Sequence, residues 1–121
     1  MTSAEVSHRL LFVWRDIDAV LAPVLGRRGV DALFSRSLHL TQRIHSWLVH
    51  SGSEDASPDL PALGAALERQ NAPEAIAAAI HILDTFHSLL ASLVGHSLTE
   101  RLLRSVWTHA SSPPHGQDSS Q

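Results

Sequence analysis

The sequence predicts an all-α protein, an up-and-down antiparallel bundle of four to five helices. Apolar residues between positions 72 and 94 recur at steps of four and three, which is the spacing of one helical face. The same spacing recurs between positions 6 and 24, so two long helices offer apolar stripes to a shared core. A chain of 121 residues, 44% of them hydrophobic, can enclose that core as one domain. The stripes are Ala72, Ile76, Ala79, Leu83, Phe86, Leu90 and Leu93, and Val6, Leu10, Val13, Ile17, Val20 and Val24.

The amino-terminal half is predicted to form two helices. The first covers residues 4–25 and ends at Gly26, which can take the backbone conformation that closes a helix. The turn 26–29 is short and returns the chain antiparallel. The second helix is predicted over residues 30–50, and its apolar side chains spread over more than half of its circumference. One neighbouring helix does not cover an arc of that width.

The middle of the chain carries two signals for the start of a helix. Asp59 followed by Pro61 is typical of a capped first turn, and leucines at helical spacing follow it in a short helix. Asn71 followed by Pro73 is a second such start, and it opens the long helix whose end Gly95 marks. The two starts therefore separate a short helix from a long one.

The carboxyl-terminal part is predicted to form one more helix and a tail. Ser97 and Glu100 have the spacing of a capping box, and apolar residues follow on one face, so a last helix is expected over 98–107. Residues 110–121 are mostly Ser, Pro, Gly and Gln with almost no apolar side chain, and we expect them to be disordered. The folded domain is predicted to comprise residues 1–109.

Composition excludes several classes of function. The chain has no cysteine, which excludes a disulfide framework, a thiolate metal site and a cysteine nucleophile. It has neither a nucleophile elbow nor a glycine-rich phosphate loop, so we expect no catalytic residue and no enzyme activity. A net charge of −3 does not favour nucleic acid or a membrane surface. With no visible signal peptide or membrane span we expect a cytoplasmic protein, and basic residues that are all arginine suggest a bacterial source.

The broad apolar arc of the second helix predicts a homodimer. Its uncovered flank would carry Phe34, Leu38 and Val49, and exposed apolar strips usually mark contact surfaces. Leu103 and Trp107 near the tail are expected to contribute to an interface of the same kind, with a second copy or a protein partner. In the alternative, the last helix folds back and covers the flank.

Nine histidines raise the question of a metal site, and their spacing does not favour one. No two histidines lie three or four residues apart, as two ligands from one helix must, although Asp84 and His87 form a mixed pair with that spacing. We therefore expect no metal and no cofactor. His45 and His87 fall on apolar arcs, and Asp18 is the nearest acidic candidate to satisfy them in a buried polar cluster. Satisfied core histidines are one interpretation, and sensing of protons, a metal or haem is the other.

Two neighbouring arginines suggest an anion site. Arg27 and Arg28 lie in the predicted turn, where free backbone amides open the second helix. Guanidinium groups and such amides can bind an anion together. The alternative is an ordinary solvated turn.

Part of the chain resembles a known family. Segments 63–67 and 77–83, with Asn71 between them, are similar to the central helical hairpin of histidine phosphotransfer domains, small four-helix bundles that relay phosphate between receiver domains. In that family an exposed histidine precedes Leu, Lys and Gly, and His81 and Leu83 match the first two positions. The resemblance implies that His81 accepts the phosphoryl group, so its side chain is expected to point away from the core.

The same comparison shows three departures from the family pattern. Asp84 stands in place of the lysine, Thr85 in place of the glycine, and Ile80 in place of the preceding alanine. A carboxylate beside the accepting nitrogen repels incoming phosphate. The sequence therefore predicts a non-enzymatic interaction or signalling-accessory protein, homodimeric and cytoplasmic. A phosphotransfer relay through His81 and a metal- or haem-binding sensor are the alternatives.

Overall fold

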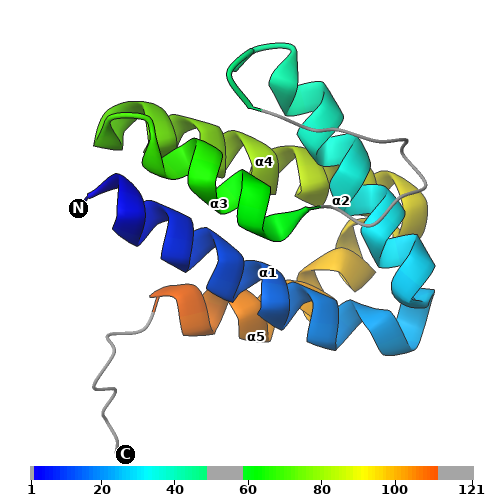
Figure 1. The fold of residues 1–121 in the computed structure, drawn as a ribbon. Helices are drawn as coiled ribbons and strands as arrows, with labels where there is room; N and C mark the ends of the chain where they lie inside the picture. Colours follow the sequence, from blue (N-terminus) through cyan, green and yellow to red (C-terminus); the bar gives the residue numbers. More distant parts are fainter. Residues whose placement is uncertain (1, 49–58, 112–121) are drawn as a thin grey trace, which may run out of the picture.

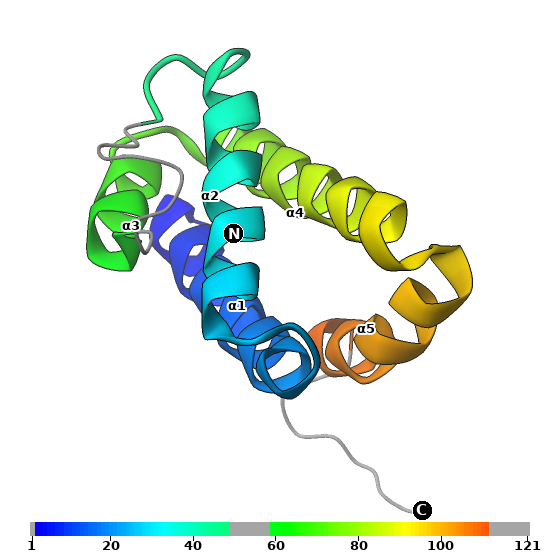
Figure 2. The same ribbon diagram turned by 90° about the vertical axis from the view of Figure 1, so that its right-hand side faces the viewer.

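Five helices form the part of the chain that the computed structural model describes, residues 2–48 and 59–111, and they confirm the predicted all-α helical bundle. They are α1 (Ser3–Leu25), α2 (Arg27–Gln42), α3 (Leu60–Glu68), α4 (Ala72–Val94) and α5 (His96–Ser111). Helices α1, α3, α4 and α5 run alternately in opposite directions, as in an up-and-down bundle, while α2 crosses α1 and α4 steeply (Figure 1, Figure 2).

Helix α1 is the centre of the bundle, because it packs against each of the other four helices. The predicted stripe is buried from Val6 to Ile17, and Trp14 and Leu21 join it in the core. The stripe ends earlier than predicted, since Val24 is 52% exposed. Burying one stripe against four neighbours makes α1 the helix that the others share.

Three aromatic side chains from three helices meet in the middle of the core. The rings of Trp14 on α1 and Phe34 on α2 are stacked, with centroids 3.6 Å apart and planes 23° apart. Phe86 on α4 meets Trp14 edge-on at 5.3 Å. All three side chains are buried, and edge-to-face and offset contacts of this kind stabilise beyond the area that they bury.

The predicted interface on α2 is wrong. Phe34 and Leu38 lie in the core, so the flank that seemed to need a second copy is covered from within the chain by α1 and α4. Leu103 is also fully buried, because α5 packs against α1 and α4. The error has a physical cause: α2 crosses two helices and buries a wider arc than it would in contact with one. Val49 and the side chain of Trp107 lie outside the described residues.

Helix α2 begins and ends earlier than predicted. It covers Arg27–Gln42 instead of 30–50, and Gly26 alone connects it to α1 in place of a four-residue turn. Gly26 has φ 82° and ψ 153°, a conformation that is essentially confined to glycine, and it redirects the chain within one residue. Helix α2 therefore leaves α1 at a steep angle. After Gln42 the chain turns over α4, and Leu48 is buried in the core there.

The buried face of α4 overlaps the predicted stripe at Ala79, Phe86 and Leu90 but is otherwise displaced around the helix. Ile82 is fully buried, whereas the predicted Ile76 and Leu83 are half-buried and Leu93 is 62% exposed. Packing between α1 on one side and α2 on the other determines which face is covered, and periodicity within one helix cannot show this. The buried residues of α4 are Ala75, Ala78, Ala79, Ile82, Phe86, Leu90 and Ala91.

The predicted helix starts in the middle of the chain are confirmed. Asp59 accepts a hydrogen bond from the backbone N–H of Ala62 at 3.1 Å, and Asn71 accepts one from that of Glu74 at 2.9 Å. Each contact satisfies an amide that has no partner within its own helix. Gly95 ends α4 as predicted, with a positive φ of 92°.

The last helix is longer than predicted. It begins at His96, directly after Gly95, so Ser97 and Glu100 lie inside its first turns and form no capping box there. It continues to Ser111, two residues beyond the predicted limit of the domain at residue 109. Residues 112–121, most of the predicted tail, lie outside the described residues.

Helix α4 is also long and apolar enough to cross a membrane, by length and composition alone, and it is the one such helix in the described residues. The core helix of a globular bundle has the same properties. In this structure its apolar face packs against α1, α2 and α5.

Substitution of Gly26 or Gly95 by alanine should destabilise the fold by about 1–3 kcal/mol through backbone strain. A Cβ atom at either position would meet no other atom within 4 Å, so steric crowding does not contribute. Urea unfolding of both variants measures the loss. A loss below about 0.5 kcal/mol at both sites would show that the connections relax without glycine.

Phe34→Ala should reduce the free energy of unfolding by about 3–5 kcal/mol, because it leaves a cavity between Trp14 and Phe86. Phe12→Ala is the matched control, since Phe12 is exposed on α1 and should change stability by no more than about 0.5 kcal/mol. Thermal and chemical denaturation compare the two. Equal effects would contradict the assignment of Phe34 to the core.

Candidate functional site

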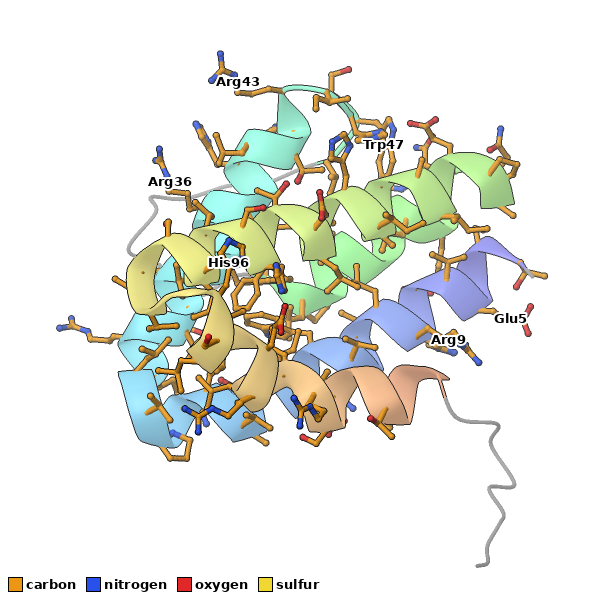
Figure 3. The ribbon with its side chains drawn as sticks, turned by 180° about the vertical axis from the view of Figure 1, so that it is seen from behind. Glu5, Arg9, Arg36, Arg43, Trp47 and His96 are labelled. Atoms are coloured by element: carbon orange, nitrogen blue, oxygen red, sulfur yellow. The ribbon has the colours of Figure 1, made fainter. Side chains whose placement is uncertain are left out.

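Two histidines, a glutamate and a tryptophan meet where the chain turns back over α4. His45 and Trp47 lie in the segment that follows α2, and Glu74 and His81 lie two turns apart on α4. Figure 3 shows Trp47 above the first half of α4, while Arg43 points away into solvent. His45 is only 8% exposed, so its ring nitrogens need partners within the protein. We call these four residues the histidine cluster.

Glu74 orders the cluster through one carboxylate oxygen. Its Oε2 accepts a hydrogen bond from Trp47 Nε1–H at 2.9 Å and another from His45 Nδ1–H at 2.8 Å. These two donors, first Trp47 and then His45, lower the pKa of Glu74 from its ordinary value of 4.5 because they stabilise the ionised carboxylate. Glu74 is therefore an anion at neutral pH. Its side chain is 40% exposed, so water also solvates the charge.

The second nitrogen of His45 faces His81. His45 Nε2 lies 3.3 Å from His81 Nδ1, and the two rings are 76° apart in plane. A carboxylate can only accept, so the proton of His45 stays on Nδ1. One proton is then shared between the two facing nitrogens. Either a neutral His81 donates to His45, or a protonated His45 donates to His81.

This arrangement can hold a proton or a metal ion between two imidazoles. A carboxylate–imidazole pair becomes catalytic when a nucleophile or a bound substrate lies next to the free ring nitrogen. Here the neighbour of that nitrogen is a second histidine. The geometry thus favours binding of a proton or a metal ion over nucleophilic catalysis.

The predicted cluster of Asp18, His45 and His87 does not form. Asp18 accepts a hydrogen bond from Arg27 at 2.9 Å where α1 meets α2, and His45 takes Glu74 as its acidic partner. His87 is half-buried on α4, and within residues 2–48 and 59–111 the hydrogen bonds of Asp18 and His45 go to other side chains. The prediction failed because the turn after α2 moves His45 away from the position that a longer helix would give it.

One of the two arginines of the predicted anion site forms an ion pair with Asp18. The guanidinium of Arg27 is bound to Asp18, and Arg28 is exposed beside it. A side chain that already neutralises a carboxylate attracts an added anion less strongly. With Arg27 paired to Asp18, an anion site at Arg27 and Arg28 stays a prediction.

His81 lies differently from the orientation that the family resemblance implied. It is half-buried instead of exposed, and its Nδ1 is engaged by His45. Asp84 lies exposed on the next turn of α4, and Glu74 carries a negative charge on the other side of His45. Phosphotransfer through His81 stays a prediction.

A second feature of α4 is an apolar groove shared with α1, which we call the α1–α4 groove. Its volume is about 250 Å³, and each wall is built from residues at positions i, i+3, i+4 and i+7 of one helix. The lining residues are Val6, Arg9, Leu10 and Val13 of α1, and Ile76, Ala79, Ile80 and Leu83 of α4. Arg9, the charged residue of this set, lies on the side of the molecule seen in Figure 3.

Comparison of this chain with protein-family models, with curated proteins and with solved structures finds no match. The candidate functions therefore depend on the geometry of this structure.

Sequence reasoning missed two members of the histidine cluster. Neither Glu74 nor Trp47 was predicted to belong to a site. One signal was present: Glu74 and Asp84 are the only acidic residues on α4, a mainly apolar helix. The partner of Glu74 lies 29 residues away in sequence, and no local pattern identifies it.

Glu74→Gln should destabilise the protein at neutral pH and much less in acid. The pKa of Glu74 is lowered by folding, so its contribution is present above the unfolded value of 4.5 and is lost as the pH falls through the folded value. Urea unfolding of the wild type and the variant at a series of pH values down to about 3 measures the difference.

Glu100→Gln, at an exposed carboxylate on α5, is the matched control for general effects of removing one charge. A penalty for Glu74→Gln that is the same at neutral and acid pH would contradict the assignment of an ionised, hydrogen-bonded Glu74.

Proposed function

We propose that this chain is a non-enzymatic interaction protein that forms a homodimer through the α1–α4 groove. The observation that carries the proposal is the groove itself: two walls of side chains at helical spacing, apolar except for Arg9, around about 250 Å³. Ridges of a packed helix fit between rows with this spacing. An apolar groove on the surface of a bundle is typical of a contact site.

A second copy of the chain is the occupant that suits this surface. Ile80 belongs to the lining of the groove, yet it is 62% exposed, so one surface provides both a depression and a projecting apolar side chain. A two-fold axis pairs such a surface with itself and places each Ile80 against the groove of the other copy. This surface replaces the one that the sequence suggested around Phe34 and Leu38.

Such a dimer would act as a scaffold or a signalling accessory, because both roles depend on contacts between proteins and need no chemical reaction. The histidine cluster lies on another face of α4, since His81 follows Ile80 by one residue and is rotated from it by about 100°. Self-association and chemistry at the imidazoles can therefore be tested separately.

Ile80→Glu should weaken self-association by at least about tenfold, because a dimer would bury an unpaired charge. Sedimentation equilibrium over a range of protein concentrations measures the dissociation constant. Leu93→Glu is the matched control: it lies on the same helix, has the same 62% exposure and is rotated from Ile80 by about 220°. Both variants should stay folded, since both side chains are largely exposed.

Two results would overturn the homodimer. If the wild-type protein remains monomeric at high micromolar concentration, no second copy occupies the groove and the proposal fails. An effect of Leu93→Glu equal to that of Ile80→Glu would place the contact elsewhere on the surface.

A further inference from the structure

We propose that His45 and His81 bind a divalent transition-metal ion of the zinc or copper type, with His45 Nε2 and His81 Nδ1 as its two protein ligands. This site is independent of the proposed dimer. The two histidines come from different elements and lie 36 residues apart in sequence, yet their ring nitrogens face each other across 3.3 Å. Neutral imidazole nitrogens are the most common ligands of such ions.

The separation of the two nitrogens matches a coordination geometry. Zinc–nitrogen bonds of about 2.0–2.1 Å at a tetrahedral angle place two ligand nitrogens about 3.3–3.4 Å apart. His45 Nε2 and His81 Nδ1 are already at that distance. A metal ion replaces the proton that they share, and His81 then carries its own proton on Nε2. Binding requires the two rings to rotate so that both lone pairs point at one ion.

The hydrogen bonds around His45 are those of a metal ligand. Its second nitrogen, Nδ1, donates to Glu74 at 2.8 Å, and metal-bound histidines usually donate their other N–H to a carboxylate in this way. The contact fixes the tautomer that leaves Nε2 free and makes that nitrogen a stronger donor to a metal. Trp47 holds the same oxygen of Glu74 in place at 2.9 Å. The ligand is therefore oriented before the ion arrives.

Burial and charge determine how an ion reaches the site. His45 is almost fully buried, whereas His81 is half-buried, so His81 forms the side that solvent can approach. The negative charge of Glu74 lowers the cost of placing a cation there. Among the described residues no three His, Cys, Asp or Glu side chains converge on one point. Water molecules complete the coordination shell, and the affinity is that of a two-imidazole site.

Calorimetric titration of the untagged protein with zinc chloride tests the proposal. We expect one ion per chain for the wild type and binding at least tenfold weaker for His81→Ala. Glu74→Gln keeps both ligands and removes their support, and it should weaken binding by about 10- to 100-fold. His96→Ala is the control, since His96 is exposed at the start of α5, away from Trp47 in Figure 3, and this variant should bind as the wild type does.

A second measurement locates the ion in the wild type itself, so its main result does not depend on how a variant folds. Long-range ¹⁵N–¹H correlation spectra of the wild type should show zinc shifting His45 Nε2 and His81 Nδ1, while His45 Nδ1 keeps its proton. His81→Gln retains a side chain that can hydrogen-bond to His45 and should abolish these shifts. The proposal is overturned if the wild type binds no ion, if His81→Ala binds as tightly as the wild type, or if only other histidines shift.

Discussion

The stack of Trp14 on Phe34 is the contact on which the rest of this structure depends. It holds α2 across α1, and Phe86 extends the contact to α4. Because α2 crosses both helices, its end reaches α4, and the chain that follows turns over the first half of that helix (Figure 1). The meeting of His45 and Trp47 with Glu74 is a consequence of this crossing. Gly26 makes the crossing possible by redirecting the chain within one residue.

Helix α4 carries both surfaces to which we assign a function. Its buried face contacts α1 and α2, and the two margins of that face remain accessible. Ile80 and Leu83 lie on the margin toward α1, where the groove opens, and Glu74 and His81 lie below the turn that follows α2. A helix packed between two neighbours at different angles leaves two unlike margins. In this protein one margin is apolar and the other holds titratable groups.

The candidate site was only partly visible in the sequence. His45 was expected to be buried and to need an acidic partner, and both expectations are met. The partner is Glu74 instead of Asp18, because the chain leaves the helical path after Gln42. Spacing rules test whether two ligands share one helix, and no histidine pair here has that spacing. They are silent about His45 and His81, which approach from different elements.

The sequence by itself determined the helical class and most places where helices begin or end. Asp59, Asn71 and Gly95 act within one turn of chain, and such local contacts are the same in any tertiary setting. The apolar stripe of α1 was equally local. Only the tertiary structure decided that α2 buries Phe34 within the chain and that α4 presents Ile82 to the core. These outcomes depend on the angles at which helices cross, which packing of the whole core selects.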